Sequence, residues 1–456
     1  MSVLVIGAGD VGFMIAKRLS EEDIDVYVIE KDEAKISRLS QMLDVQVVLG
    51  SGSSVESLEK ANIAHTEMLI AVTDSDEVNL VASFIASTFI DIPTKIARVR
   101  GKDYESAKKI FDKEYLDIDL IINPEQEATK TIENLLDIPG SQDAILVADG
   151  RVRMGGFNVM RDSPLAGRAL KDIPEITRGM RFLIAAIMRQ GDLLIPKGKD
   201  LILEGDCVYV VMDQGKNEDI LAFMGIRKRH TQTVMIYGGS ITGEILAQRL
   251  EKKGIKVKLI EHDEARCIEL SETLTHTTVL NSDFMNRELL ENERVFDMDA
   301  FIAVSYDEEA NILSSLLAKR MGTPHVISIV NNLDYTSLVN DIGVDAVVNP
   351  RMVVVSRILQ FIRKGKVYTV TSLSNTDAEV IEVEAMETSD LVQRPIKSMH
   401  WPSNAIIAGI VRQGNGRVIV PGGNTTIDPG DRVIIFAKKF AIPTVEKIVS
   451  VKLDFF

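Results

Sequence analysis

The stretch Val3–Gly12, with the sequence VLVIGAGDVG, places four apolar residues directly before three closely spaced glycines. A continuous apolar run is typical of a buried strand in a parallel sheet, and the glycines allow a tight turn into a following helix. The N-terminus of that helix would present backbone N–H groups to a pyrophosphate. A matching stretch, VMIYGGSITG, begins at Val234, so the first glycines of the two motifs lie 231 residues apart (238 − 7). The pattern predicts a duplicated dinucleotide-binding fold.

The residues after each glycine motif repeat as well. Apolar runs that predict strands alternate with stretches of helical spacing, which indicates a parallel sheet covered on both faces. An acidic residue ends the second predicted strand in both halves, as Glu30 and Glu261, and an Asn-Pro pair closes each region at Asn123 and Asn349. In the first half the strands are predicted at 3–6, 25–29, 46–49, 68–72, 95–99 and 120–122.

Each α/β region is followed by short apolar runs that glycine-containing turns separate. Pro196 and Gly205-Asp206 in the first of these stretches match Pro421 and Gly430-Asp431 in the second. Such runs predict a small β-rich domain. We therefore predict an α/β protein with two Rossmann-like parallel-sheet domains, each followed by a small α+β domain. The predicted domains are 1–135, 140–226, 231–362 and 367–456.

Length and charge narrow the class of protein. A chain of 456 residues is long enough for roughly three or four domains. The formal net charge is −15 and the sequence pI is near 5.0. This balance argues against binding nucleic acid by general electrostatics, because that needs basic patches, and against adsorption to anionic lipid.

The compartment can be predicted from the cysteines and the apolar stretches. Two cysteines, Cys207 and Cys267, lie in different repeats, which fits a reducing cytoplasm better than a disulfide framework. The chain begins with a predicted strand and not with a signal peptide. The longest uncharged stretches, 78–90 and 398–411, are shorter than the ~20 apolar residues that a membrane span needs. Any membrane span would therefore belong to another subunit.

The first glycine motif is a candidate ligand site. Gly7 would allow the tight turn, Gly9 the close approach of a pyrophosphate, and Gly12 the packing of the helix on the sheet. Glu30 could accept hydrogen bonds from both ribose hydroxyls, which favours NAD(H) over NADP(H), and AMP, ADP or ATP would use the same contact. The candidate residues of this loop are Gly7, Ala8, Gly9, Asp10, Val11 and Gly12.

Polar residues after the predicted fourth and fifth strands extend this site. Thr73 and Asp74, and Ser305 in the second half, follow the fourth strand, where ligands bind in open α/β sheets. Arg98 ends the fifth strand, where it could contact a phosphate or support the neighbouring loop; the alternative is a plain surface or interface arginine. The second-half candidates are Gly238, Gly239, Ser240, Ile241, Thr242, Glu261 and Ser305. There Ser240 replaces Gly9, and its Cβ would crowd a pyrophosphate, so this copy is either a second nucleotide site or a structural copy only.

No residue pattern predicts catalysis. The six histidines are scattered, and no Ser/His/Asp order, Cys/His pair or C-x-x-C spacing occurs. We predict no catalytic residue, no metal ligand and no enzyme. A soluble NAD-dependent dehydrogenase and a stand-alone nucleotide sensor remain as alternatives.

At this level of detail the chain resembles the tandem RCK (KTN) domain family, which regulates potassium channels and Trk-type potassium-uptake systems. The resemblance covers essentially the whole chain and rests on two complete large–small units. The residues that carry it are Gly7–Gly12, Glu30, Ala71–Asp74, Asp76, Glu77, Asn79, Ile96–Arg98, Ile122–Glu125, Ser163–Gly167, Ile195, Pro196, Gly205 and Asp206.

The resemblance implies a function for the whole chain. It implies NAD(H) or ATP/ADP as a regulatory ligand bound by Gly7–Val11, Glu30, Thr73, Asp74 and Arg98. It also implies a homotetrameric ring on the inner face of the cell membrane, beneath a dimeric potassium-transporter subunit of the TrkH or TrkG kind. Nucleotide-dependent rearrangement of the α/β domains would then regulate potassium transport.

Overall fold

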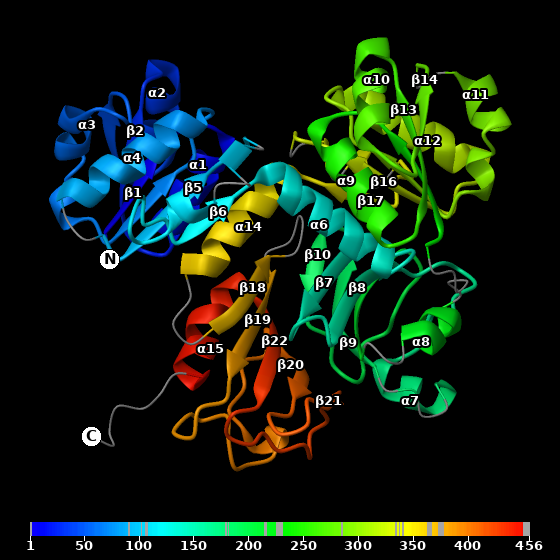
Figure 1. The fold of residues 1–456 in the computed structure, drawn as a ribbon. Coiled ribbons are helices and arrows are strands. Elements are labelled where there is room, and N and C mark those ends of the chain that lie inside the picture. Colours follow the sequence, from blue (N-terminus) through cyan, green and yellow to red (C-terminus); the bar gives the residue numbers. More distant parts are fainter. Residues whose placement is uncertain are drawn as a thin grey trace. The chain divides into compact units, whose positions relative to one another are not determined.

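The computed structural model (Figure 1) divides by its contacts into two compact units, which are described separately below. The first unit is Met1–Ala128 with Pro350–Phe361, and the second is Thr129–Asn349 with Ile362–Phe456. The predicted junctions at 227–230 and 363–366 lie outside the described residues, and the division into four domains stays a prediction. The structure describes residues 2–89, 92–101, 103–104, 108–177, 180, 182–213, 217–224, 231–283, 286–332, 335–336, 338–339, 342–362, 367–372 and 378–449.

The first unit contains a six-stranded parallel sheet in the order β3-β2-β1-β4-β5-β6. The order reverses between β1 and β4, which places the ends of these two strands at the switch point where α/β sheets bind ligands. The strand predicted at 68–72 ends one residue earlier, and the strand predicted at 95–99 begins and ends one residue earlier. The strands are β1 (Ser2–Ile6), β2 (Asp25–Glu30), β3 (Gln46–Leu49), β4 (Met68–Ala71), β5 (Thr94–Arg98) and β6 (Leu120–Ile122).

Helices cover the first sheet because their apolar residues recur on one side. In the helix after β1, residues Phe13, Ile15, Ala16 and Leu19 are buried, and charged residues occupy the other face. The next helix begins where the Asp32 carboxylate accepts the N–H groups of two residues in its first turn. The helices are α1 (Asp10–Glu21), α2 (Glu33–Met42), α3 (Val55–Lys60), α4 (Asp76–Phe89) and, from later in the chain, α14 (Pro350–Ile362).

The second unit contains the other α/β domain, whose parallel sheet has the matching order β14-β13-β12-β15-β16-β17. The duplication predicted from the glycine motifs is therefore confirmed. Its strands are β12 (Thr233–Tyr237), β13 (Lys256–Glu261), β14 (Thr278–Asn281), β15 (Ala300–Ala303), β16 (His325–Ile329) and β17 (Ala346–Val348), and its helices are α9 (Ile241–Lys252), α10 (Glu264–Thr273), α11 (Arg287–Asn292) and α12 (Glu308–Met321).

One helix links the two units. Helix α6 (Pro124–Asp137) begins at the end of the first sheet, and its later part belongs to the second unit. There the buried Glu133 carboxylate pairs with Arg249 (2.7 Å) and Lys253 (2.9 Å) on α9. The first repeat thus contributes a helix to the packing of the second α/β domain.

The two predicted small β-rich domains form two five-stranded antiparallel sheets in the second unit. Their strands are β7 (Asp143–Val147), β8 (Val152–Asn158), β9 (Leu183–Arg189), β10 (Asp192–Leu194) and β11 (Cys207–Asp213), then β18 (Val367–Ser372), β19 (Ala378–Glu384), β20 (Ala405–Val411), β21 (Val418–Ile419) and β22 (Arg432–Lys438). The predicted fold class is confirmed by this alternation of parallel and antiparallel sheets.

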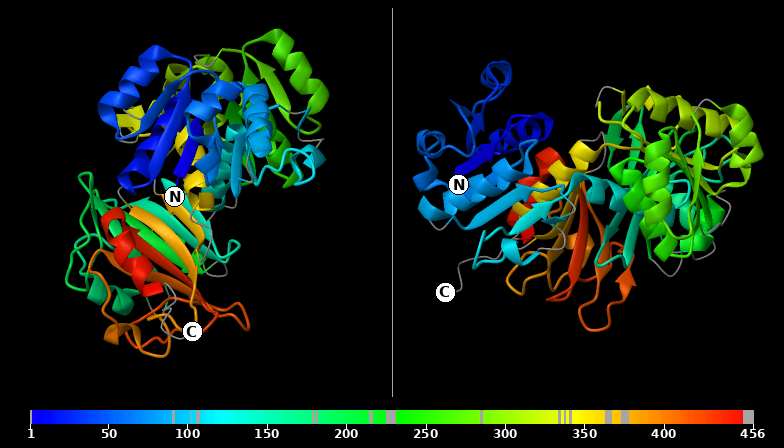
Figure 2. Two further views of the ribbon diagram at one scale, coloured as in Figure 1. Left: turned by 90° about the vertical axis from the view of Figure 1, so that its left-hand side faces the viewer. Right: turned by 45° about the horizontal axis from the view of Figure 1, so that its top comes forward.

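Alternating residues of β22 bury both faces of the last sheet. Ile434 and Phe436 share one hydrophobic core with residues of the other small domain, including Tyr209. Ile435 and its neighbours on the opposite face pack against Val445 of α15 (Ile442–Val449), the helix that covers this sheet in Figure 2. The period of two explains why β22 is apolar almost throughout. The other helices of these domains are α7 (Ile173–Ile176) and α8 (Asn217–Phe223).

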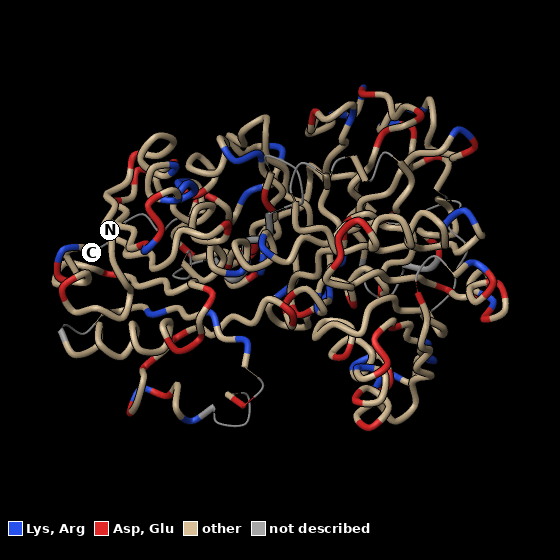
Figure 3. Tube along the Cα trace, turned by 90° about the horizontal axis from the view of Figure 1, so that it is seen from above, with Lys and Arg blue, Asp and Glu red and all other residues tan. Residues whose placement is uncertain are grey.

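The structure shows where the charged residues and the two cysteines lie. Acidic and basic residues are interspersed along the trace in Figure 3. Cys207 and Cys267 are both buried free thiols, and burial raises the pKa of each. Among the described residues, no helix has the length and apolarity needed to cross a membrane.

Candidate functional site

The loop after β1 has the geometry that its glycines predict. Gly7 has φ +98°, and a Cβ there would lie 3.0 Å from Thr73. A Cβ on Gly12 would lie 1.8 Å from the Gly7 carbonyl oxygen, so only glycine fits at this contact between helix and loop. At Gly9, by contrast, a Cβ would meet no described atom within 4 Å. The loop is therefore packed on its protein side and open on the side of Gly9.

The N-terminus of α1 is free of side-chain capping within the described residues. Gly9 is the N-cap, and it has no side chain to accept the N–H groups of the first turn. The first N–H groups of a helix have no partner within the helix, and the helix dipole makes this end favourable for an anion. Together with the open space at Gly9, this geometry suits a pyrophosphate or phosphate group.

Glu30 is held against the same loop at the end of β2. Its side chain is buried, and one carboxylate oxygen accepts the Ala8 N–H at 2.6 Å. The other oxygen accepts the N–H groups of Lys31 (2.8 Å) and Asp32 (3.1 Å). These bonds fix the position of the carboxylate next to the glycine loop, where a ribose hydroxyl could donate to a remaining lone pair.

Asn79 joins the carboxyl ends of β4 and β5 through side-chain hydrogen bonds. Its side chain is fully buried and accepts the N–H and hydroxyl of Thr73, at 2.9 and 2.7 Å. Its amide donates to the carbonyls of Thr73 (3.2 Å) and Arg98 (2.8 Å). Our list of sequence candidates omitted Asn79, although Thr73–Asn79 and Ser305–Asn311 have the same six-residue spacing (79 − 73 and 311 − 305). That spacing was the available signal.

Arg98 places a buried cation beside these residues. Its side chain is 8% exposed, and its Nε has no hydrogen-bond partner within the described part of the chain. Burial, with a smaller contribution from the nearby Arg100, lowers the pKa of Arg98 to about 10, while Glu125, Asp74 and Asp76 oppose the shift. The group stays charged at neutral pH with a donor unused. A buried donor of this kind favours an anionic ligand over an ordinary surface role.

Asp74 and Asp76 lie at the same edge of the sheet. The Asp76 carboxylate accepts the backbone N–H groups of Arg100 and Gly101, both at 2.8 Å, which holds the loop after β5. Asp74 acts on Arg98 through its charge. The structure thus places the first-copy candidates at or beside the ends of β1, β2, β4 and β5.

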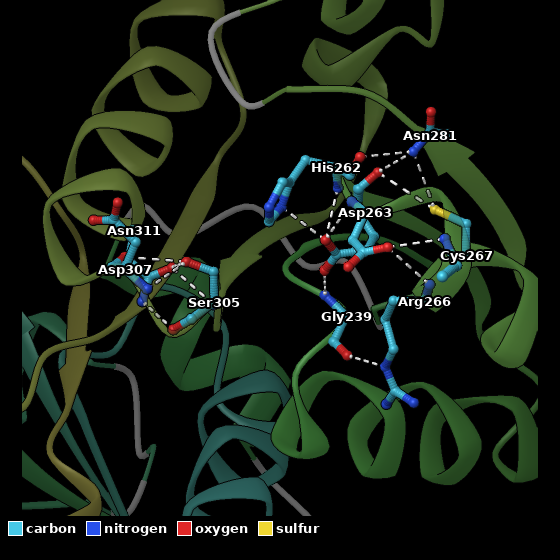
Figure 4. A network of polar contacts seen from close by, with 11 residues as sticks. Gly239, His262, Asp263, Arg266, Cys267, Asn281, Ser305, Asp307 and Asn311 are labelled. Carbon is cyan, nitrogen blue, oxygen red and sulfur yellow. Dashed lines mark hydrogen bonds and ion pairs between the residues drawn. The ribbon is translucent and has the colours of Figure 1, made fainter.

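The second copy has the same scaffold. Glu261 accepts the N–H groups of Gly239 (2.6 Å), His262 (2.7 Å) and Asp263 (2.9 Å), as Glu30 does in the first copy. Ser305 and Asn311 repeat the bonds of Thr73 and Asn79. Figure 4 shows these two residues and, across the site, Gly239, His262 and Asp263 of the same copy. Gly238 has φ +105°, and its Cβ would lie 2.4 Å from the Ser305 nitrogen.

The helix N-terminus of the second copy is occupied by the protein itself. The Ser240 hydroxyl accepts the Gly243 N–H at 3.2 Å and is 2.5 Å from the Val304 carbonyl oxygen, to which it donates. The Tyr306 hydroxyl accepts the Ile241 N–H at 3.3 Å. We expected the Cβ of Ser240 to crowd a pyrophosphate. That crowding stays a prediction, and the structure shows in addition that the serine hydroxyl is turned inward and caps the helix.

An arginine also covers the second loop. Arg266 donates to the Gly239 carbonyl (2.8 Å) and pairs with the buried Glu244 (2.7 Å) and with Glu269 (2.9 Å). Its contact with Gly239 appears in Figure 4. The first copy has Lys35 and Phe13 at the positions of Arg266 and Glu244 (266 − 231 and 244 − 231). The second loop therefore satisfies its polar groups internally to a greater extent than the first.

No cluster of three or more His, Cys, Asp or Glu side chains suited to a metal ion occurs among the described residues.

Comparison with known proteins identifies the family. The TrkA-N domain model matches residues 3–124 and 234–350, and the TrkA-C domain model matches 155–225 and 380–450. Trk system potassium uptake protein TrkA of Azorhizobium caulinodans is 35% identical over 460 residues, covering 100% of both chains. The protein of the same name from Haemophilus influenzae is 34% identical and covers 98% of each chain. The chain belongs to the TrkA family.

The TrkA-family fold also occurs in solved structures. The GsuK RCK domain has a TM-score of 0.58 at 15% identity and covers 98% of this chain and 94% of that chain. A structure described as the GsuK channel bound to NAD has the same TM-score at 15% identity and covers 98% of this chain and 78% of that chain. These likenesses establish the RCK fold, and the predicted resemblance to tandem RCK domain proteins is confirmed.

Proposed function

We propose that this chain is the regulatory subunit of a Trk-type potassium-uptake transporter and that an adenine nucleotide or NAD(H) bound in the first α/β domain controls it. The observation that carries the proposal is the combination of an uncapped helix N-terminus on α1 with a buried Arg98 that has an unused donor. Both features favour an anionic group in the same domain. Membership of a family named for potassium uptake supplies the physiological context.

The proposed contacts divide between the parts of the ligand. The N–H groups of Gly9–Val11 would bind phosphate, and Glu30 would accept from the ribose. Thr73, Asp74 and Arg98 would contact the ligand at the ends of β4 and β5. In the second copy, Gly238–Thr242, Glu261 and Ser305 form the equivalent surface, with its helix already capped by Ser240.

The proposed mechanism is coupling by binding and not catalysis. A ligand shifts a conformational equilibrium only if it binds one arrangement of the domains more tightly than another. Coupling between sites is usually about 1–3 kcal/mol. We propose that a homotetramer of this chain transmits this energy to a TrkH- or TrkG-like membrane subunit from the cytoplasmic face.

Titration calorimetry of the purified chain with NADH, NAD⁺, ATP, ADP and AMP tests the ligand. We expect at least one of these to bind at micromolar or tighter affinity, and we expect Glu30→Ala with Gly9→Ala to abolish that binding. Absence of binding by all five would contradict the proposed ligand class. Steady NADH oxidation across a panel of hydroxy- and keto-acid substrates would favour a dehydrogenase instead.

Potassium uptake tests the role. The chain and its Gly9→Asp variant would be expressed with a Trk-type membrane subunit in cells that lack their own uptake systems. We expect co-purification of both variants with the membrane subunit, and nucleotide control of uptake only with the unsubstituted chain. Failure to co-purify would favour a stand-alone nucleotide sensor.

A further inference from the structure

A residue of the second repeat lies at the N-terminus of α1 in the first. Helix α14 begins at Pro350, directly after β17 of the second sheet, but Pro350–Phe361 belong to the first compact unit. Its second residue, Arg351, forms an ion pair with the Asp10 carboxylate. Asp10 is the first residue of α1 and follows the open position at Gly9. A cation from far along the chain therefore lies beside the proposed phosphate position.

The ion pair is poorly suited to a purely structural role. The side chains of Arg351 and Asp10 are 46% and 51% exposed. Exposed pairs of this kind contribute little to stability, because water screens the two charges. Asp10 in the first turn is already favoured by the helix dipole without the arginine. The pair does, however, hold the Arg351 guanidinium next to the N-terminus of α1, which favours anions. There Arg351 could exchange the Asp10 carboxylate for a phosphate of the ligand.

The arrangement is specific to one of the two repeats. Arg351 follows Asn349-Pro350 as Glu125 follows Asn123-Pro124, and Asp10 corresponds to Ile241 (241 − 231). Glu125 carries the opposite charge and lies 3.6 Å from Arg100 in its own domain. The arginine is thus absent from the matching position of the first repeat, and the common fold does not require it.

We infer that Arg351 is a specificity residue of the first site, which selects nucleoside di- and triphosphates, such as ADP and ATP, over NAD(H) and AMP. In the unliganded chain Arg351 pairs with Asp10. When a nucleoside di- or triphosphate binds, its guanidinium transfers to the terminal phosphate, where charge-assisted bidentate hydrogen bonds are available. NAD(H) has no terminal phosphate, because its pyrophosphate is esterified at both ends, and AMP has no phosphate beyond the one that the N-terminus of α1 would bind. This inference rests on the proposed nucleotide site.

The contact would also make the first site dependent on both repeats. The glycine loop, Glu30 and Arg98 come from the first repeat, whereas α14 follows the last strand of the second sheet. A ligand that engages Arg351 acts directly on the first turn of α14. NAD(H) and AMP would bind the first repeat alone and leave that turn paired with Asp10.

Two substitutions with opposite expected effects test the inference. We expect Arg351→Gln to weaken ADP and ATP binding by about 10- to 100-fold, because a charge-assisted contact is lost, and to change NADH and AMP binding by less than about 3-fold. We expect Asp10→Asn to strengthen ADP and ATP binding by about 3- to 10-fold, because it removes a competing carboxylate and a nearby negative charge. Calorimetry with each ligand measures all four affinities.

Arg357→Gln is the matched control. Arg357 lies on the same helix, and its guanidinium donates to Gln360 at 2.8 Å. We expect it to bind every ligand as the unsubstituted chain does. Equal weakening of ADP binding by Arg351→Gln and Asp10→Asn would show that the pair serves only as a structural link. An Arg351→Gln variant that binds ADP unchanged, or loses all ligands equally, would also overturn the inference.

The outcome separates this inference from the proposed function. If the unsubstituted chain binds none of the ligands, the nucleotide site itself is wrong. If it binds NADH or ADP and only the Arg351 effects are missing, the site stands and the specificity role fails. Thermal unfolding of each variant, expected within a few degrees of the unsubstituted chain, confirms that folding is retained.

Discussion

The two α/β domains have the same strand order and the same loop hydrogen bonds, but they differ at the helix that follows the first strand. In the first domain, α1 begins at Gly9 with no side chain to accept its N–H groups. In the second, Ser240 and Tyr306 accept N–H groups at the start of α9. Asn79 and Asn311, which join the ends of the fourth and fifth strands in their respective domains, make equivalent hydrogen bonds. The comparison separates residues that maintain the fold from residues that leave room for a ligand.

The electrostatics differ in the same direction. The first domain has Arg98 buried with an unused donor, and Arg351 paired at an exposed helix end. In the second, Arg266 is committed to the Gly239 carbonyl and to Glu244. Arg98 can bind an incoming anion through its unused donor, and Arg351 has only an exposed ion pair to exchange, whereas Arg266 must first give up a backbone carbonyl and a buried carboxylate. We therefore expect nucleotide control to reside in the first domain.

The largest effect is expected from Gly9→Asp. Because a Cβ at Gly9 meets open space, the chain should fold, while the new carboxylate occupies the position of the ligand phosphate. We expect at least about a 100-fold loss of affinity, or about 2.7 kcal/mol, by calorimetry. Ser240→Ala, the control in the second domain, should leave the affinity unchanged. If Ser240→Ala weakens binding as much as Gly9→Asp, the second domain is the ligand site.

The next largest effect is expected from removing the buried asparagine that joins the ends of the fourth and fifth strands in each domain. Asn79→Ala and Asn311→Ala each remove bonds to buried backbone groups, so each should destabilise its own domain by about 2–3 kcal/mol. Hydrogen exchange should increase in β4 and β5 for the first substitution and in β15 and β16 for the second. Only Asn79→Ala should also weaken ligand binding. Equal losses of affinity in both variants would contradict the asymmetry.

Much of this scaffold could be predicted from the sequence. Continuous apolar runs before glycines predict buried parallel strands, and their recurrence at a constant offset predicts the duplication, because both signals are local. Glu30 and Glu261 could be placed because an acidic residue ends the second strand in each repeat. The packing of the two small sheets on one core could not be predicted, since the apolar face of β22 does not specify which sheet covers it.

The features that distinguish the two sites were harder to predict. The capping role of Ser240 could not be predicted, because its rotamer depends on a hydrogen bond to the Val304 carbonyl, which lies 64 residues away in the chain (304 − 240). Tyr306 contributes its hydroxyl from the loop after β15, and Arg351 reaches Asp10 from the opposite repeat. Each depends on tertiary contacts between distant segments, which local patterns do not encode.

Acid should affect the second domain more than the first. His325 on β16 is buried, and burial lowers its pKa below 6.5; Lys319 acts in the same direction, while Asp345 and a hydrogen bond with the Ser141 backbone oppose the shift. Below about pH 6.5 the unfolded chain binds a proton that the folded chain excludes, so stability falls as the pH falls towards the folded pKa. The slope is at most about 1.4 kcal/mol per pH unit.

His325→Thr tests this effect, because Thr94 occupies the same position in the first sheet. We expect the substitution to reduce the acid-dependent hydrogen exchange of β15–β17 between pH 7 and pH 5 and to leave that of β4–β6 unchanged. If both domains lose protection equally in the unsubstituted chain, His325 is not the source of the difference.

The smallest effect is expected from making the second site resemble the first. Ser240→Gly with Tyr306→Phe removes two acceptors from the start of α9 and frees the N–H groups of Ile241 and Gly243. Loss of the cap should cost about 1 kcal/mol or less, since glycine is itself tolerated at an N-cap. We expect a second, weaker binding event in calorimetry, because Glu261 and Ser305 already have the geometry of their counterparts. Arg266 remains paired with Glu244 and should limit the affinity.

If the variant still binds one ligand per chain, then capping is not what separates the two sites, and the internal pairing of Arg266 becomes the feature to change. If the unsubstituted chain already binds two, the two domains are equivalent in function despite their different helix ends.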